Sequence, residues 1–473
     1  MDNKYDVIII GAGIGGLTCG CYLAKAGKKV LIIEKNRNAG GYCCSFNRKG
    51  FNFDASVHSF SSCGPTEPLG KIIKELDLDV RITRITPSDV VITPDFKIEI
   101  QPNLTDTISQ FIKLFPHEKK IVQFFSLFDK KPNIELYFEL KNKTYQDLLD
   151  EFFTDFKIKA ILSIFLGNFG IPPSKASAFT TVLSFKSFVF NGGYYPVGGM
   201  QKFANSLVKA FTLHGGEIIY NKKVIKAEVS RKRIKKIVLE TGELLNADIV
   251  VSNIDARYLF FNIIGKIKLP LGFILKLTKL LPSSSAFLVY LGTKRFNKNG
   301  LEKYLGIWNM PDDYDIENTF LMPLKNKMLN NSFLFCSNQF GLSENNSTDV
   351  IRLIVNAPFK NADFWKRERE SFSDNLISRT SSFFPKLKEN ILIKETATPH
   401  TLFSTTFNFN GSMCGWLNSE NQNKTDLSTE HGLKNLFLTG HWVTEKYGQG
   451  GIAMCAYSGK KIVKKILANL KCR

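Results

Sequence analysis

The sequence lacks several features that identify common classes of protein. Its nine cysteines include no C-x-x-C pair, which excludes a standard zinc ribbon or finger, so we expect no metal site. No apolar run approaches the length of about 18 residues that a membrane-spanning helix needs. No Ser-His-Asp set is recognisable among residues that include only six histidines. The 473 residues are 44% hydrophobic and 22% charged, which predicts a globular protein of roughly two to four domains.

Acidic residues are scarce relative to basic ones. The 63 Lys and Arg residues exceed the 43 Asp and Glu residues, and the net charge is +20. This balance indicates an anionic partner such as a phosphate-rich ligand or an acidic membrane surface, with lysine-rich codon bias as the alternative. The lysines are dispersed and no zinc-finger or helix-turn-helix motif is present, so no nucleic acid is expected. The acidic Asp2 and Asp6 precede the first apolar run, which is unlike a secretory signal and predicts a cytoplasmic protein.

The amino terminus carries the strongest motif. In order, it contains a strand-like run at 5–10, the turn Gly11-Ala-Gly13-Ile-Gly15-Gly16, a helical stretch to 27, and a second strand-like run at 29–33 that is followed by Glu34. Gly11 permits a tight turn, Gly13 lets the backbone approach a diphosphate, and Gly16 allows close packing of helix on sheet. The carboxylate of Glu34 stands where an adenosine ribose is bound. The complete unit predicts a dinucleotide site.

The next segment favours FAD over NAD. The pair Gly40-Gly41 follows Glu34 closely, and Asp54 comes after a short run of aromatic and polar residues. This segment resembles the amino-terminal signature of the flavoproteins that include amine oxidases, protoporphyrinogen oxidase and phytoene desaturases. The resemblance implies that Glu34, both glycines and Asp54 lie along FAD. Tyr42 stands where that group often has Arg or His.

Further blocks extend the resemblance along the chain. They are Tyr195-Pro-Val-Gly-Gly-Met200 with a helix at 203–213 and a strand at 217–220, Thr398-Pro399 with Gly415-Trp416, and Gly440-His441 with Ser458-Gly459. Together with residues 6–54 they resemble the phytoene desaturase, carotenoid isomerase and retinol saturase-like family. The resemblance implies hydride transfer to or from FAD and a polyene or isoprenoid lipid substrate, held in an apolar tunnel rich in Phe.

The order of elements predicts an α/β fold with a discontinuous Rossmann-type (GR2-like) FAD-binding domain. A helix, a strand, a hairpin and a strand over 203–251 are typical of the second half of such a domain, after a long insertion. We expect the FAD-binding domain at 1–80, 191–255 and 406–473. The inserted α+β substrate domain, with a helical membrane-associating part, is expected at 81–190 and 256–405. No oligomeric state is predicted.

The expected cofactor contacts come from both ends of the chain. They are Gly11, Gly13, Ile14, Gly15, Gly16, Glu34, Lys35, Gly40, Gly41, Tyr42, Asp54, Val224, Gly440, His441, Gly450, Gly451 and Ile452. His441 stands where the family usually has an acid that touches FAD, and we interpret it as packing against the cofactor. No catalytic acid or base is identified, because the family's chemistry is carried by the cofactor. Candidates are His58, His400, His441 and Trp416.

Residues 258–281 contain four lysines and no acid. Pro270 divides the segment, so it cannot be one straight helix. Leu271, Ile274, Leu275 and Thr278 form a helical stripe with lysines elsewhere, which is typical of a helix lying in a membrane interface. An ordinary core helix with solvated lysines is the alternative. We expect peripheral membrane association.

Several functions share these motifs. The favoured one is a desaturase-like FAD-dependent oxidoreductase that acts on a carotenoid or another long isoprenoid lipid at the membrane. A cis-trans isomerase that uses reduced FAD, a saturase and a flavin amine oxidase are alternatives, as is a module that binds a nucleotide for structure only.

Overall fold

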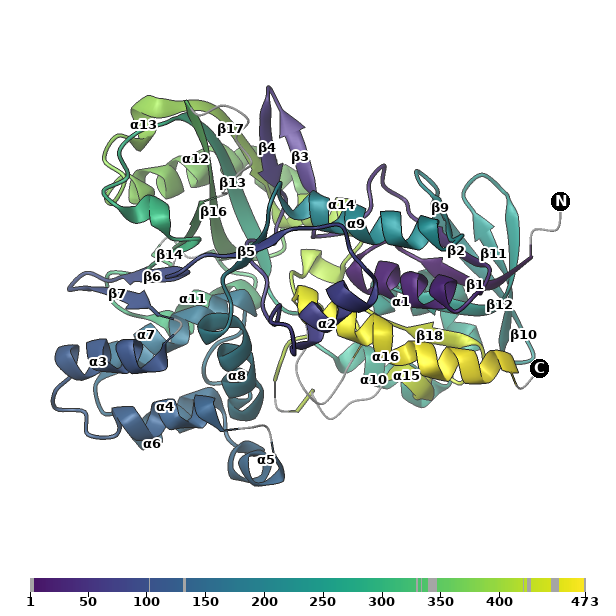
Figure 1. Ribbon diagram of the computed structural model, residues 1–473, viewed down its shortest axis with the longest axis horizontal. Helices are drawn as coiled ribbons and strands as arrows, with labels where there is room; N and C mark the ends of the chain where they lie inside the picture. Colours follow the sequence, from purple (N-terminus) through teal and green to yellow (C-terminus); the bar gives the residue numbers. More distant parts are fainter. Residues whose placement is uncertain are drawn as a thin grey trace.

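The computed structural model describes residues 4–101, 103–130, 133–328, 331–332, 334–338, 347–419, 421–422, 427–443 and 451–471. Two seven-stranded sheets dominate these residues. The first sheet lies on the side of the molecule where both chain termini are found, and the second lies at the opposite end (Figure 1). A lobe of helices packs beneath the second sheet in this view.

The first sheet has a parallel centre with an antiparallel edge. Its strands run in the order β10 (Val224–Ser230), β11 (Arg233–Leu239), β12 (Leu244–Ser252), β1 (Lys4–Ile10), β2 (Val30–Ile33) and β9 (Glu217–Ile219), with β18 (Leu436–Leu438) paired to β12. β1 pairs in parallel with both β2 and β12. Because β1 and β2 are apolar along their buried lengths, both faces of this part of the sheet are covered. The predicted strand, glycine turn, helix and strand at the amino terminus are confirmed.

Helices cover one face of the first sheet. They are α1 (Ile14–Lys25), α2 (Pro68–Glu75), α9 (Met200–Leu213) and α16 (Ile452–Lys471). Val7, Ile9 and Ile32 from the sheet share one buried cluster with Leu17 of α1 and Leu207 of α9. This packing fixes the amino terminus of α1 at the carboxyl end of β1, as the glycine turn predicts.

The opposite face of the first sheet is covered by the basic segment. A helical stretch at Tyr258–Gly265, a short turn at Lys266–Lys268 and α10 (Leu271–Lys279) make up this segment. Phe260, Phe273 and Leu277 pack with Ile8 and Leu31 of the sheet. The segment therefore packs on the first sheet, although the sequence grouped it with the second unit. Among the described residues, no helix is both long and apolar enough to span a bilayer.

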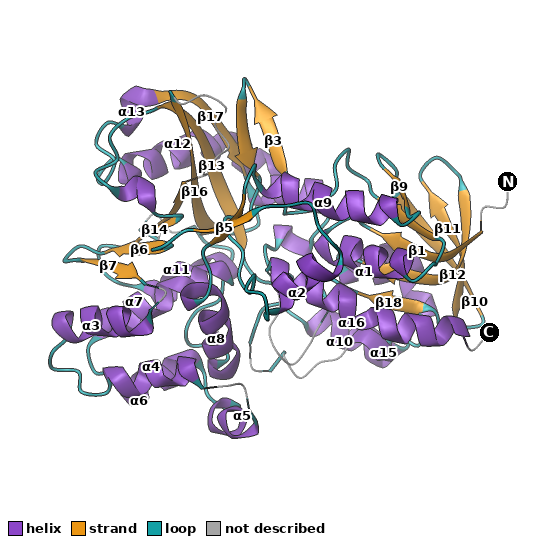
Figure 2. Cartoon of the chain, viewed as in Figure 1, coloured by secondary structure: helices purple, strands orange, loops and turns teal. Residues whose placement is uncertain are grey.

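The second sheet is mixed. Its strands run in the order β17 (Ile391–Ala397), β13 (Ser285–Lys294), β16 (Thr348–Ala357), β15 (Leu334–Asn338), β14 (Gly306–Asn309), β6 (Asp89–Ile92) and β7 (Lys97–Ile100). α12 (Ala362–Thr380) and α13 (Leu387–Asn390) cover one face, where Trp365 and Phe372 pack on Phe287. The other face is turned toward the first sheet (Figure 2). Residues of this sheet also line part of the cavity described below.

The region at 104–190, predicted to be helical and rich in Phe, forms the helical lobe. It contains α3 (Leu104–Leu114), α4 (Ile121–Asp129), α5 (Ile134–Leu140), α6 (Tyr145–Phe152), α7 (Phe156–Ser163) and α8 (Ala178–Phe185), with short helical turns at Ile164–Asn168 and Lys186–Phe190. Most of its phenylalanines pack on one another, as Phe124, Phe125 and Phe128 do. They form a closed core, whereas Phe169 and Phe188 of the same region line the cavity described below.

Shorter elements connect these layers. They are the hairpin of β3 (Ser45–Arg48) and β4 (Phe51–Asp54), the pair β5 (Ile82–Arg84) and β8 (Tyr194–Pro196), the helices α11 (Ile316–Leu324), α14 (Pro399–Thr406) and α15 (Leu427–Glu430), and the turns at Leu301–Lys303 and Phe409–Gly411. The β3–β4 hairpin reaches the second sheet, where Phe53 packs on Tyr290 of β13.

Candidate cofactor and substrate site

A cavity of about 500 Å³ runs between the two sheets. One end is formed by the glycine turn before α1, by Glu34 and by residues that follow β12. The other end is formed by residues of the second sheet and of the helical lobe. The cavity therefore joins the predicted dinucleotide site to a second chamber, by which we mean the part of the cavity lined by the second sheet and the helical lobe.

The glycine turn exposes backbone N–H groups at the amino terminus of α1 and has no room for side chains. Gly13 is the N-cap residue of α1, and no side chain caps the helix. A Cβ on Gly13 would lie 2.6 Å from Asn253 Nδ2, and one on Gly15 would lie 2.8 Å from the backbone nitrogen of Gly440. Uncapped N–H groups and the helix dipole at such a terminus favour a diphosphate.

Glu34 lies at the end of β2 and is buried. Its Oε2 accepts a hydrogen bond of 2.8 Å from the Ala12 amide, and its Oε1 accepts one of 2.9 Å from the Asn36 amide. These bonds hold the carboxylate against the glycine turn. The remaining lone pairs can accept hydrogen bonds from ribose hydroxyls.

Two lysines flank this end of the cavity. Lys35 Nζ lies 4.4 Å from the centre of the Phe407 ring, and Lys223 Nζ lies 4.8 Å from the same ring. Burial lowers the pKa of Lys35, and the charge of Lys223 acts in the same direction. All three residues line the cavity. The positive charges of Lys35 and Lys223 complement a diphosphate.

The second glycine pair is tied to the first. The Gly40 amide donates a 2.8 Å hydrogen bond to the Ala12 carbonyl, and Gly40 has a φ of 118°. Only glycine adopts this backbone conformation readily.

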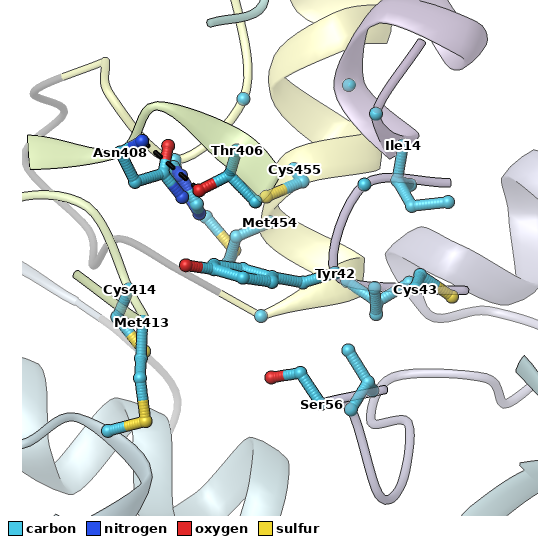
Figure 3. Close-up of a pocket in the computed structure, with 18 of the residues that line it drawn as sticks. Ile14, Tyr42, Cys43, Ser56, Thr406, Asn408, Met413, Cys414, Met454 and Cys455 are labelled. Atoms are coloured by element: carbon cyan, nitrogen blue, oxygen red, sulfur yellow. Dashed lines mark hydrogen bonds between the residues drawn. The ribbon is translucent and has the colours of Figure 1, made fainter. Parts of the chain in front are cut away.

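Tyr42 follows this glycine pair and occupies the centre of the view in Figure 3, with Thr406 and Asn408 on one side and Ser56 on the other. Its hydroxyl donates to the Ser412 carbonyl at 2.9 Å, and burial raises its pKa to about 12.

The carboxy-terminal block closes the cavity between these turns. Gly440, His441, Gly451 and Ile452 all line it, whereas Gly450 lies outside the described residues. The His441 ring packs edge-on against Trp442 at 5.5 Å. Burial lowers the pKa of His441 to about 4, so its imidazole is neutral near pH 7. This placement is compatible with packing against a cofactor.

Most residues predicted to bind the cofactor line this one cavity. Those that do are Gly11, Gly13, Ile14, Gly15, Glu34, Lys35, Gly40, Gly41, Tyr42, Val224, Gly440, His441, Gly451 and Ile452. Gly16 instead permits close packing, because its Cβ would lie 2.3 Å from the Gly11 carbonyl oxygen. Which of these residues touch the cofactor stays a prediction.

Two catalytic candidates do not line the cavity. Trp416 is buried, and its indole N–H donates a 2.9 Å hydrogen bond to the Trp442 carbonyl. His400 lies in the first turn of α14, with its ring 6.4 Å from that of Phe403. The structure gives Trp416 a packing role. His58 and His441, the two remaining candidates, do line the cavity.

Asp54 is completely buried and does not line the cavity. Its carboxylate accepts hydrogen bonds from the Tyr195 hydroxyl at 2.6 Å, the Ser45 hydroxyl at 2.6 Å and the Met200 amide at 2.9 Å. Tyr195 lies in β8, and Met200 is the first residue of α9. Both belong to the sequence block at 195–200. Asp54 therefore fastens the hairpin of β3 and β4 to α9.

Replacing Asp54 with alanine is expected to lower the free energy of unfolding by about 2–3 kcal/mol, because three buried donors lose their acceptor. Thermal unfolding measures this loss. Asn52→Ala on the same strand is the control, since it removes only an exposed bond to Asn47, and a change of about 0.5 kcal/mol or less is expected. Equal effects of both substitutions would contradict the anchoring role of Asp54.

The second chamber has a floor made by strand register. Leu288 pairs with Ile354, Ile354 pairs with Phe335, and Phe335 pairs with Trp308 across four neighbouring strands. Paired residues point to the same face of a sheet, and all four side chains line the cavity. Leu183 and Phe188, from α8 and the turn after it, also line the cavity. The floor of the chamber is therefore apolar, while His58, Asn168 and several serines add polar groups to the cavity wall.

Some lining residues could not be singled out from the sequence. Asn253 directly follows β12, the strand next to β1, and the end of a parallel strand at this position is a signal for a ligand site. Ser56, Asn408 and Cys414 carry no comparable spacing signal. They reach the cavity through the packing of distant segments (Figure 3).

Comparison with known proteins agrees with this architecture. Three relatives are similar along most of the chain: an all-trans-retinol 13,14-reductase of Danio rerio (21% identity over 96% of this chain and 84% of the relative), a 1-hydroxycarotenoid 3,4-desaturase of Flavobacterium sp. (strain P99-3) (23%, 96% and 97%), and prolycopene isomerase 1, chloroplastic, of an Oncidium hybrid cultivar (25%, 84% and 73%). Putrescine oxidase bound to putrescine shares the fold, with a TM-score of 0.69 and 15% identity over 98% of this chain and 99% of that one.

The match to a family model is equally extensive. The model described as flavin containing amine oxidoreductase matches residues 14–467, which run from the start of α1 to near the end of α16 and include the whole second sheet and every strand of the first sheet except β1. The glycine cradle and Glu34 fit the adenosine diphosphate part of FAD. The chain therefore belongs to the family of flavin containing amine oxidoreductases and is an FAD-dependent oxidoreductase.

Proposed function

We propose that this oxidoreductase acts on a carotenoid or another long isoprenoid lipid, with hydride transfer to or from the flavin. The observation that carries the proposal is the apolar floor of Leu288, Ile354, Phe335 and Trp308, which continues directly from the cofactor end of the cavity. The names of the relatives, a retinol reductase, a carotenoid desaturase and a prolycopene isomerase, point to the same class of substrate.

Different parts of the chain have different roles in this proposal. FAD, when bound, supplies the acceptor or donor of hydride. The glycine turn and Glu34 hold its adenosine diphosphate, while Lys35 and Lys223 add positive charge. The apolar floor orients the lipid and excludes water. In this division residues 1–80, 191–255 and 406–473 form the discontinuous FAD-binding domain around the first sheet. Residues 81–190 and 256–405 supply the inserted substrate domain, except that the basic segment at 258–279 packs on the first sheet.

Alternatives within the family differ in net redox chemistry. An isomerase or a saturase would use the same cavity. The oxidation state of the flavin before and after turnover, measured by its absorbance, distinguishes these enzymes. An amine oxidase is less well supported, because an ammonium substrate calls for a nearby carboxylate. Within the described residues, Glu34 is the only acidic side chain that lines the cavity, and it lies at the adenosine end.

The substrate class calls for a route from the bilayer, and the basic segment offers one. Ile267, Leu271 and Leu275 are 93%, 70% and 54% exposed. Leu271, Leu275 and Lys279 are spaced by four residues and therefore lie on one face of α10. Exposed apolar side chains surrounded by lysines are typical of a segment that inserts into an anionic membrane interface. We include peripheral membrane binding through this segment in the proposal.

Changing Lys266, Lys268 and Lys279 together to glutamine is expected to weaken binding to anionic liposomes, by about 1 kcal/mol or roughly fivefold for each lysine. Lys276→Gln is the matched control. Its ammonium is paired with Glu430 at 2.5 Å, so its loss has a smaller effect. Sedimentation with phosphatidylserine and phosphatidylcholine vesicles at two salt concentrations measures both. Equal binding to the two lipids, or to neither, would leave the segment as an ordinary core helix.

A further inference from the structure

Several polar side chains line the cavity beside its apolar floor, and one of them is an imidazole. His58 lies in the loop after β4 and lines the cavity. Its ring centre lies 4.5 Å from that of Phe335 and 5.6 Å from that of Phe188. It is half-buried and lines the cavity, so a ligand in the cavity can hydrogen-bond to its ring nitrogens. An imidazole beside two phenyl rings gives this wall a polar group that a ligand can use.

The loop that carries His58 is held in place by a buried charge. Arg352 of β16 is fully buried, and its Nη1 donates to the carbonyls of Asp54 at 2.8 Å and Val57 at 3.2 Å. These bonds fix the backbone on both sides of Ser56 and directly before His58. The imidazole is therefore positioned in advance, which lowers the entropic cost of using it for binding.

The imidazole is neutral near pH 7. Burial lowers the pKa of His58 to about 3, and the charge of Arg352 acts in the same direction. A neutral imidazole has one N–H donor and one acceptor nitrogen, and the hydroxyl of an alcohol matches either of them. Ser56 and Ser184 line the same chamber and add further hydroxyl groups. The chamber is thus built for more than a pure hydrocarbon.

We propose that the substrate is an isoprenoid lipid that carries a hydroxyl group, and that His58 hydrogen-bonds to this group and sets the substrate's position in the chamber. The inference rests on the lipid substrate of the proposed function and narrows it to alcohols. His58 is assigned a binding role, in which it selects a substrate and places it relative to the cofactor.

Two pairs of ligands test the inference on the FAD-loaded protein. The first is all-trans-retinol and its analogue with a methyl group in place of the hydroxymethyl group, and the second is 1-hydroxylycopene and lycopene. Quenching of protein fluorescence gives the dissociation constants, since Trp308 lines the chamber. In at least one pair we expect the alcohol to bind about tenfold more tightly than the hydrocarbon.

Variants then assign the preference to the imidazole. His58→Leu is expected to bind both members of the pair with equal affinity, and His58→Gln, which keeps a donor and an acceptor, is expected to restore part of the preference. Phe188→Leu is the matched control, because it alters the same wall without removing a polar group. This variant is expected to bind both ligands more weakly and to keep the ratio of their dissociation constants unchanged.

The possible failures are distinguishable. Equal affinity within both pairs for the wild-type protein, or an unchanged preference in His58→Leu, would overturn the role of His58 and leave the proposed lipid substrate intact. If none of the four ligands binds to protein that has its full complement of FAD, the lipid substrate and this inference are both overturned.

Discussion

Replacement of Gly13 by valine is expected to abolish FAD binding. The φ of Gly13 is −71°, which any residue adopts, so backbone strain is not the cause. The cause is space: a Cβ would lie 2.6 Å from Asn253 Nδ2, and two further methyl groups would fill the place where the backbone approaches a diphosphate. We expect the affinity for FAD to fall by more than about a hundredfold, which corresponds to about 2.7 kcal/mol.

Absorbance of the purified protein near 450 nm, before and after reconstitution with FAD, measures this effect. We expect the wild-type protein to hold its flavin non-covalently and to release it on denaturation. Gly272→Ala is the matched control, because no atom lies within 4 Å of its added Cβ and its φ is not positive. Circular dichroism checks that Gly13→Val keeps its secondary structure. A folded Gly13→Val protein with a full complement of flavin would contradict the assignment of the cradle.

The amino-terminal unit could be predicted because its chemistry is local. A diphosphate at a helix terminus requires a strand, small residues, a helix and an acid within one short stretch. Residues 5–34 show all of these, and the structure places β1, α1, β2 and Glu34 accordingly. The same locality explains why the start of α16 directly after Gly451 could be predicted.

Features that depend on long-range packing were harder to predict. The stripe of Leu271, Ile274, Leu275 and Thr278 suggested a single apolar face on α10, but Phe273 and Leu277 face the core while Leu271 and Leu275 are exposed. A helix with apolar residues on two sides has no periodicity that identifies its buried side.

Asp54 and the phenylalanines illustrate the same limit. The motif placed Asp54 near FAD, but side chains of a strand alternate between its two faces, and the structure turns Asp54 toward Tyr195 and Met200. The abundance of Phe predicts an apolar tunnel, and Phe169, Phe188 and Phe335 do line the cavity. Phe124, Phe125 and Phe128, however, form the core of the helical lobe. Which phenylalanines reach the cavity depends on strand register and packing, which composition does not reveal.

Anaerobic mixing of the oxidised flavoprotein with its polyene substrate is expected to bleach the flavin absorbance almost completely if the protein is a desaturase. Desaturation takes a hydride and a proton from neighbouring carbon atoms, and the hydride reaches the flavin before any external acceptor is needed. Stopped-flow absorbance near 450 nm and mass spectrometry of the product measure the two halves of the reaction. Putrescine is the control ligand, and bleaching by this amine alone would favour an amine oxidase.

The same experiment separates the remaining alternatives, because each predicts a different final state of the flavin. An isomerase leaves the oxidised flavin unchanged and turns over only after prior reduction, and the mass of its product equals that of the substrate. A saturase reoxidises a reduced flavin as a product heavier by two hydrogen atoms accumulates. We favour net redox chemistry, since the relatives include a reductase and a desaturase beside the isomerase. A product of unchanged mass, formed only by the reduced enzyme, would refute that choice and leave the cavity, the cofactor and the lipid substrate in place.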